Sequence, residues 1–227
     1  MKKKLTKTQF PFVTLKYAQT LDGKIATQKG DSKWISNKKS LVFAHKLRSQ
    51  NQSILVGIGT IRKDDPQLTT RLVKGKNPVR IILDSKLSIR LSSKVLKKNP
   101  ERTIIATTNL ASEKKIKKLV NSGAKVLVVK KKNKRVDLCD LLKKLKKQKI
   151  DSVLVEGGAG VITSFLKERL FSRIVIIIAP KIFGKGESSI DESKIKRSFK
   201  AFLFSSKKIY KFENDLVFDG ILAKTKE

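Results

Sequence analysis

The feature that most constrains this chain is an alternation of short, β-branched apolar runs with segments of helical spacing. Strands that alternate with helices form α/β domains, because each helix returns the chain to a shared sheet. The alternation continues along most of the 227 residues without an internal repeat or a Pro-rich linker, which favours one domain. Strands are predicted at 12–18, 53–57, 79–84, 103–107, 125–129, 152–156 and 174–179.

Capping residues predict the helices between these strands. Asn37 is a suitable N-cap for a helix that continues to Ser49, and a second helix is predicted at 112–123. Asp137 would cap a third helix, whose four leucines share one face while its lysine pairs occupy the other. Such a helix packs on a core and exposes a solvated basic face.

The end of the chain has the pattern of an antiparallel hairpin. Strand-like runs cover 201–211 and 216–222, with a turn at 213–215. A sheet that begins with parallel strands and closes with such a hairpin is mixed and mainly parallel.

One cysteine and one histidine restrict the chemistry of the chain. Cys139 has no partner for a disulfide within the chain, which fits a reducing cytoplasm. Zinc sites made of Cys and His need three or four ligands, so we predict no metal site. His45 lies in a stretch of helical spacing, and we interpret it as a helix-surface or half-buried residue rather than a catalytic base.

The start of the chain does not have the pattern of a signal peptide. The lysines at 2–4 are not followed by an apolar signal region, and the longest apolar runs are of strand length. We therefore expect a cytoplasmic protein with no membrane partner.

The excess of basic residues, 53 against 19 acidic ones, raises the alternative of a nucleic-acid-binding module. The basic residues are mostly lysine and are scattered over nearly every segment, whereas base and phosphate recognition favours arginine. Aromatic residues, which single-strand binders interleave with basic ones, make up only 6%. We therefore expect no specific nucleic-acid partner, although the net charge of +34 would attract polyanions at low salt.

Two glycine-containing segments follow predicted strands. Gly57 and Gly59, with the Thr60 hydroxyl, could let backbone amides approach a phosphate, or they could form a plain tight turn. Glycines at 157–160 lead into a predicted helix, whose N-terminus favours an anion. Glu156 immediately precedes them and would suit a polar, non-phosphate part of a substrate; the alternative is a glycine turn with an incidental glutamate.

Polar residues also gather in loops at 21–24, 31–34 and 62–71. Trp34 lies in such a loop and is a candidate to cover a flat ring. Arg48 and Arg71 could each grip a phosphate through the planar guanidinium. The residues alone therefore indicate an α/β enzyme that binds phosphorylated, nucleotide-like ligands.

Taken in order, these segments resemble the reductase domain of riboflavin biosynthesis, the C-terminal half of the bacterial bifunctional deaminase/reductase. The resemblance covers about residues 11–186, and an ordered series is more specific than any single motif. The matching stretches are 11–16, 21–27, 30–36, 45–48, 54–60, 64–71, 78–85, 155–158 and 179–186.

The resemblance implies a dihydrofolate-reductase-like, three-layer α/β/α fold with a mixed, mainly parallel sheet, usually dimeric, that uses NADPH. The implied reaction is hydride transfer to the ribosyl C1′ of 5-amino-6-(5-phosphoribosylamino)uracil. The alternative substrate is 2,5-diamino-6-(5-phosphoribosylamino)pyrimidin-4-one, which the stand-alone relatives reduce. The pattern of Ser32 and Trp34 looks more like the uracil-using branch.

By position, the resemblance assigns residues to the two ligands. Lys16 and Glu156 are the expected catalytic residues. The residues expected at the substrate are Lys16, Ser32, Arg48, Leu68, Arg71 and Glu156. Those expected at the cofactor are Ala18, Trp34, Thr60, Asp64, Ser85, Gly158, Ala159, Gly160, Val161, Ile162, Thr163 and Ser164, to which the glycine argument adds Gly57 and Gly59.

The expected organisation is a basic extension at 1–10 followed by a single NADPH-dependent reductase domain at 11–227. The bifunctional members carry an N-terminal zinc deaminase with Cys and His ligands. Only about ten residues precede the reductase motif here, so we expect no deaminase activity. A homodimer is expected, and a separate deaminase is a candidate partner.

Overall fold

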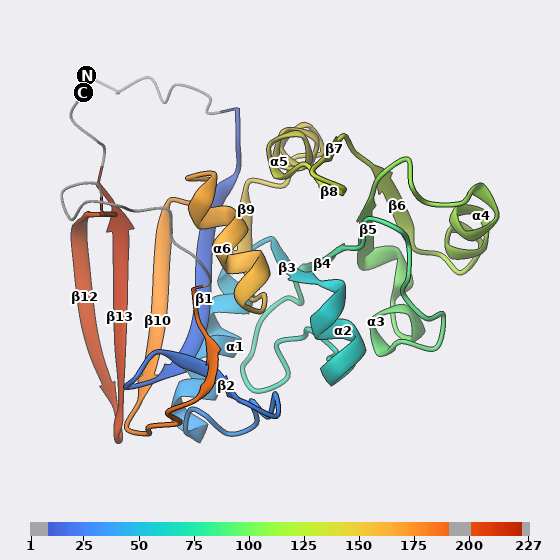
Figure 1. The fold of residues 1–227 in the computed structure, drawn as a ribbon. Coiled ribbons are helices and arrows are strands. Elements are labelled where there is room, and N and C mark those ends of the chain that lie inside the picture. The colour runs from blue at the N-terminus through green and yellow to red at the C-terminus, as the bar shows by residue number, and fades with distance from the viewer. Residues whose placement is uncertain (1–8, 191–200, 224–227) are drawn as a thin grey trace, which may run out of the picture.

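A nine-stranded sheet forms the middle layer of the computed structural model, which describes residues 9–190 and 201–223 (Figure 1). The six neighbouring pairs from β10 to β6 are parallel, and the last two pairs are antiparallel. The predicted mixed, mainly parallel sheet with a C-terminal hairpin is confirmed. The strand order is β12 (Phe204–Phe212), β13 (Asp215–Leu222), β10 (Arg173–Ala179), β1 (Phe12–Thr20), β9 (Ser152–Val155), β3 (Ser53–Gly57), β4 (Val79–Leu83), β5 (Thr103–Thr107) and β6 (Lys125–Val128).

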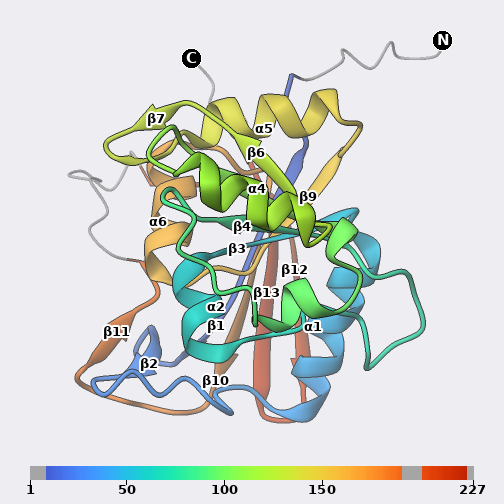
Figure 2. The ribbon, with the colours of Figure 1, turned by 90° about the vertical axis from the view of Figure 1, so that its right-hand side faces the viewer.

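Helices cover both faces of this sheet, which confirms the predicted three layers. Helices α5 and α6 pack on one face, and α1 to α4 pack on the other. In Figure 1, α6 crosses in front of the sheet and α1 lies behind it; Figure 2 separates the two layers. The helices are α1 (Lys38–Gln50), α2 (Ile58–Asp64), α3 (Lys94–Lys97), α4 (Glu113–Asn121), α5 (Leu138–Lys147), α6 (Ala159–Lys167) and the short 3₁₀ helix at Pro100–Arg102.

Successive residues of a strand point to opposite faces of the sheet, and in these strands both sets of side chains are apolar. In β9, Val153 and Val155 join the core beneath α5 and α6, whereas Leu154 packs with Leu47 of α1. Strands that are buried on both faces appear in a sequence as continuous apolar runs, which is how they were predicted. All four leucines of α5 are buried, as its helical spacing predicts.

The predicted caps are confirmed at two helices. Asn37 Oδ1 accepts a hydrogen bond from the Ser40 amide at 2.9 Å, and Asp137 Oδ1 accepts one from the Asp140 amide at 3.0 Å. Asn37 also attaches α1 to the C-terminal hairpin, because its backbone N–H donates to Asp215 Oδ2 at 2.8 Å. These contacts fix the start of α1, the helix that carries Arg48.

The sequence did not predict the short polar strands. Strands β2 (Lys24–Thr27) and β11 (Gly186–Ser188) form a separate two-stranded sheet, and β7 (Lys131–Lys132) pairs with β8 (Arg135–Val136). The glycine segment after β3 is the start of helix α2, not a tight turn. The predicted basic extension, residues 1–10, lies almost wholly outside the described residues. No helix in the described part of the chain is long and apolar enough to cross a membrane.

Candidate active site

Lys16, in the middle of β1, lies beside Glu156, the residue that follows the carboxyl end of the neighbouring parallel strand β9. The register of β1 and β9 pairs Leu15 with Val155, so the two following residues are adjacent. Alternation places both side chains on the face that α1 covers. Ligands of open α/β sheets bind at this carboxyl edge, which makes the pair the centre of the candidate site.

Arg48 of α1 reaches across to Glu156 and forms a two-point ion pair. Arg48 Nε donates to Glu156 Oε1 at 2.9 Å, and Nη2 donates to Oε2 at 2.8 Å. The side chains are only 13% and 10% exposed. Arg48 Nη1 donates to the Thr69 carbonyl at 3.2 Å, so three of the five guanidinium N–H groups are used within the protein. The arginine predicted to grip a phosphate is therefore already engaged with the predicted catalytic glutamate.

The charged side chains of this cluster shift one another's pKa values. Burial alone would raise the pKa of Glu156, but the nearby Arg48 and Lys16 cations hold it at about 2, so the carboxylate is ionised. Burial lowers the pKa of Lys16 and Arg48 lowers it further, while Glu156 partly offsets both effects. Within the described residues, no hydrogen bond or ion pair occupies the half-buried Lys16 amine. A lysine with a lowered pKa and a free ammonium group is well suited to proton transfer.

His45 belongs to the same cluster, and its predicted surface or half-buried position is wrong. The residue is 0% exposed, because α1 turns it inward together with Arg48, three residues further on. Its Nε2 lies 3.4 Å from Arg48 Nη1, and its Nδ1 accepts from the Leu72 amide at 3.4 Å. Burial and the cations of Arg48 and Arg71 lower the pKa of His45 to about 4. The spacing of His45 and Arg48 on one helix was the available signal that the sequence analysis missed.

The predicted substrate residues Leu68 and Arg71 lie in the loop whose Thr69 carbonyl binds Arg48. Leu68 is buried and has a left-handed backbone, with φ of 53°. Such a conformation is unfavourable for leucine and marks a loop that its surroundings hold in place. Arg71 is exposed, so its guanidinium is open to a ligand.

The starts of α2 and α6 lie together at the same carboxyl edge. A Cβ at Gly57 would lie 2.9 Å from Val161 of α6, so this glycine lets the two helix starts approach each other. A Cβ at Gly157 would lie only 2.5 Å from the same valine, within the segment that begins α6. At Gly59, Gly158 and Gly160, by contrast, a Cβ would meet no atom within 4 Å. Open glycines beside two helix starts leave exposed backbone amides facing free space, the surroundings that a phosphate group needs.

The other predicted cofactor residues are spread along this edge. Ala18 follows Lys16 on the same face of β1, and Asp64 is exposed at the end of α2. Ser85 Oγ accepts a hydrogen bond from the Val136 amide at 3.1 Å, which leaves its O–H free to donate. Within α6, Ala159, Ile162 and Thr163 are buried, whereas Gly160 is exposed.

The loop that carries Ser32 and Trp34 is not joined to the cluster by any hydrogen bond between described residues. Ser32 is half-buried, and Trp34 is 74% exposed with φ of 59°. The Trp34 carbonyl accepts from Lys181 Nζ at 2.5 Å. A side chain at Gly30 would touch the Lys63 amine, which brings this loop towards α2.

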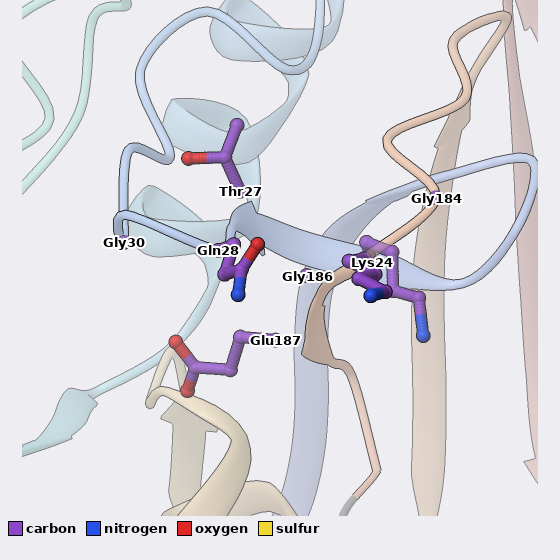
Figure 3. Close-up of a pocket in the computed structure, with 8 residues that line it drawn as sticks. Lys24, Thr27, Gln28, Gly30, Gly184, Gly186 and Glu187 are labelled. Carbon is purple, nitrogen blue, oxygen red and sulfur yellow. The ribbon is translucent and has the colours of Figure 1, made fainter.

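A surface hollow between β2 and β11 contains none of the predicted site residues. Its volume is about 620 Å³, and in the view of Figure 3 Gln28 and Glu187 lie together, away from Lys24. No buried charged side chain lines this hollow, whereas the Lys16 cluster holds ionised groups out of water. The cluster is therefore the better candidate for chemistry. The lining residues are Lys24, Thr27, Gln28, Gly30, Gly184, Lys185, Gly186 and Glu187.

Comparison with known proteins supports a family assignment. The sequence model of the RibD C-terminal domain matches residues 11–218. The riboflavin biosynthesis protein RibD of Aquifex aeolicus is 47% identical over 91% of this chain and 56% of its own length. The 2,5-diamino-6-ribosylamino-4(3H)-pyrimidinone 5′-phosphate reductase of the same organism is 36% identical over 77% of this chain and 79% of its own length. The chain thus spans about half the length of its RibD relatives.

Solved structures agree with the fold described above. RibD of Acinetobacter baumannii superposes with a TM-score of 0.83 at 27% identity, covering 96% of this chain and 59% of that protein. Dihydrofolate reductase of Enterococcus faecalis superposes with a TM-score of 0.51 at 12% identity, over 93% of this chain and 95% of that one, which shows a shared fold. The dihydrofolate-reductase-like fold is therefore confirmed. The ordered motifs, the sheet topology and the match over residues 11–218 together show that this chain belongs to the RibD C-terminal domain family.

Proposed function

We propose that this chain is an NADPH-dependent reductase of riboflavin biosynthesis that reduces the ribosyl C1′ of 5-amino-6-(5-phosphoribosylamino)uracil. The observation that carries the proposal is the half-buried Lys16 amine beside the Arg48–Glu156 pair, at the carboxyl edge of a sheet of this family. The same reduction of the 2,5-diaminopyrimidinone is the second candidate. It is favoured by the Aquifex relative whose name carries that substrate.

The carboxyl edge supports a dinucleotide cofactor. The open glycines 59, 158 and 160 leave room for a diphosphate, and the two adjacent helix starts supply backbone donors. The reduced nicotinamide would supply a hydride to C1′ when it is bound. The residues proposed to hold the cofactor are Ala18, Trp34, Gly57, Gly59, Thr60, Asp64, Ser85 and the segment Gly158, Ala159, Gly160, Val161, Ile162, Thr163, Ser164.

Arg71 is the proposed phosphate ligand of the substrate. It is exposed at the loop that binds Arg48, whereas the nearly buried Arg48 guanidinium already donates to Glu156 and to the Thr69 carbonyl. Arg48 would act at the substrate through Glu156, whose orientation it fixes. Ser32 and the Leu68 backbone are proposed to complete the substrate site, and Glu156 would accept from substrate N–H or O–H groups.

Lys16 is the proposed proton donor. The ribosylamine ring opens to an iminium, which keeps its N–H, when the bond between C1′ and the ring oxygen breaks, and that oxygen then requires a proton. The Lys16 ammonium can supply this proton and take one back from water, because its pKa is lowered by burial. The former ring oxygen takes up this proton and C1′ takes up the hydride, which together give the ribitylamino product.

We also propose that residues 11–227 form one cytoplasmic reductase domain that assembles as a homodimer. One domain is supported by the single sheet that holds strands from Phe12 to Leu222. A dimer is supported by β12, the outer strand of that sheet, which leaves Ile209 71% exposed. Sedimentation equilibrium of the chain and of an Ile209→Lys variant tests the assembly, and a wild-type monomer at micromolar concentration contradicts it.

The decisive experiment measures NADPH oxidation by the purified chain with each pyrimidine. Consumption with the uracil compound supports the first candidate, and a higher kcat/KM with the diaminopyrimidinone replaces it with the second. Consumption with neither compound rejects both. A salt-titrated mobility-shift assay tests the nucleic-acid alternative, for which tight, sequence-selective binding at physiological salt is the supporting result.

A further inference from the structure

The loop at residues 68–72 is fixed to helix α1 at two backbone positions. The Thr69 carbonyl accepts from Arg48 Nη1 at 3.2 Å, and the Leu72 amide donates to His45 Nδ1 at 3.4 Å. Arg71 lies between these two attachments and is exposed. The backbone that carries Arg71 is therefore held by two side chains of one helix.

The middle of the loop is held from the other side. Thr70 is buried, and its amide and hydroxyl both donate to Asn77 Oδ1, at 2.9 and 3.0 Å. The Val73 amide donates to the Thr70 carbonyl at 3.0 Å and closes a turn around Arg71, so the Leu72 amide is the point at which His45 holds this turn. The attachment at His45 is thus the one that Arg71 depends on most directly.

The uncharged imidazole of His45 has a single lone pair on nitrogen, but two donor groups lie beside the ring: Arg48 Nη1 and the Leu72 amide. The imidazole pKa of about 4, set by burial and by the Arg48 and Arg71 cations, leaves it uncharged near neutral pH, so one ring nitrogen carries a hydrogen. Arg48 Nη1 has the Thr69 carbonyl as acceptor for one of its two N–H groups. The Leu72 amide has no other acceptor among the described residues, so the lone pair is assigned to Nδ1.

We propose that His45 is a positioning residue. Its Nδ1 accepts a hydrogen bond from the Leu72 amide and thereby holds the backbone of Arg71 where this arginine can meet the phosphate of the substrate. The inference rests on the proposed function only in taking Arg71 as the phosphate ligand. A leucine could fill the space of the imidazole, but it could not bind the Leu72 amide. This difference separates positioning from simple packing.

Three substitutions at this position test the proposal, with ribose 5-phosphate as the probe. His45→Asn retains a polar group near Nδ1, His45→Gln places one near Nε2, and His45→Leu retains neither. Loss of one hydrogen bond corresponds to about a five- to tenfold weaker binding of ribose 5-phosphate. We expect this loss in the Leu and Gln variants and near wild-type binding in the Asn variant, with NADPH affinity unchanged in all three. Wild-type binding by the Leu variant overturns the proposal.

A double-mutant cycle checks that His45 acts through Arg71. If it does, His45→Leu combined with Arg71→Ala weakens ribose 5-phosphate binding no more than Arg71→Ala alone; additive losses contradict it. Because these titrations need no turnover, they separate this inference from the proposed reaction. With an active enzyme, the same variants should raise KM and leave kcat within about twofold.

Nuclear magnetic resonance of the wild-type protein gives a readout independent of any variant. His45 is the only histidine of the chain, so ¹⁵N-labelled histidine yields a single imidazole spectrum. A non-protonated Nδ1 at pH 7 supports the proposal. A protonated Nδ1 overturns it, because the Leu72 amide would then have no acceptor on the ring.

Discussion

Arg48 and Glu156, 108 positions apart in the sequence, form a two-point ion pair with distances of 2.9 and 2.8 Å. The pair joins helix α1 to the end of strand β9 and is nearly buried. Its geometry makes it a structural support and an electrostatic neighbour of Lys16 at the same time. Several of its consequences can be measured.

Removal of one partner should destabilise the fold strongly. Arg48→Met leaves the Glu156 carboxylate buried without its counter-ion, and such changes cost about 3–5 kcal/mol. Urea unfolding at pH 7 measures this loss. The control is Lys132→Met, which breaks the more exposed Lys132–Glu168 pair and should cost less than about 1 kcal/mol. Similar values for the two variants would mean that the Arg48–Glu156 pair is not buried in solution.

Stability should fall with acid in two successive, slightly overlapping pH ranges. The pKa of His45 is lowered in the folded state from 6.5 to about 4, so the unfolded chain binds the proton more readily and stability is lost as pH falls from 6.5 towards 4. The pKa of Glu156 is lowered from 4.5 to about 2, so its contribution is lost as pH falls from about 4.5 towards 2. Urea midpoints against pH show both windows.

Variants separate these two windows. His45→Asn should reduce the loss between pH 6.5 and 4, and Glu156→Gln should reduce the loss at lower pH, where Asp140, whose pKa is also lowered, still contributes. A His45→Asn profile that coincides with the wild-type profile would contradict the buried position of the imidazole.

Replacement of Lys16 should affect turnover far more than cofactor binding. General acid catalysis contributes about 10²–10⁴-fold, so Lys16→Met should lower kcat by at least about 100-fold and leave NADPH affinity within about twofold. Single-turnover kinetics and fluorescence titration measure the two quantities. Lys167→Met, an exposed position on α6, is the matched control. Turnover equal to wild type would remove Lys16 from the mechanism.

The two neighbouring glycines before α6 should respond differently to a methyl group. A Cβ at Gly157 would overlap Val161, so Gly157→Ala should destabilise the fold by about 1–3 kcal/mol. Gly158 has open space, so Gly158→Ala should leave stability nearly unchanged and weaken NADPH binding several-fold. Thermal unfolding and NADPH titration distinguish the two effects. Unchanged NADPH binding in Gly158→Ala would show that the cofactor does not use this space.

The central part of the fold could be predicted because strands buried on both faces appear as continuous apolar runs. Strands β3 and β5 have the predicted limits, and the four leucines of α5 are buried as their spacing requires. Strands β2 and β11 could not be found in this way. They are short and polar, and each is stabilised by pairing with the other, not by a local pattern.

The site was predictable as a set of residues but not as a set of contacts. The resemblance brought Lys16, Arg48 and Glu156 forward, yet nothing local shows that Arg48 uses two of its donor groups on Glu156. The burial of His45 likewise depends on what α1 packs against. Pairings between distant segments are properties of the tertiary structure, and a single sequence carries little information about them.

The place of β1 in the sheet has a consequence for synthesis on the ribosome. The first strand to emerge lies between β9 and β10, which are made more than 130 residues later. Lys16 therefore has no site to join until the chain has been translated at least to Glu156. Until then the apolar strand remains without partners, a situation in which chaperones commonly bind nascent chains. Because β1, an interior strand of the sheet, is the first strand of the domain to be synthesised but gains its two neighbours only late in translation, the domain must assemble almost as a whole.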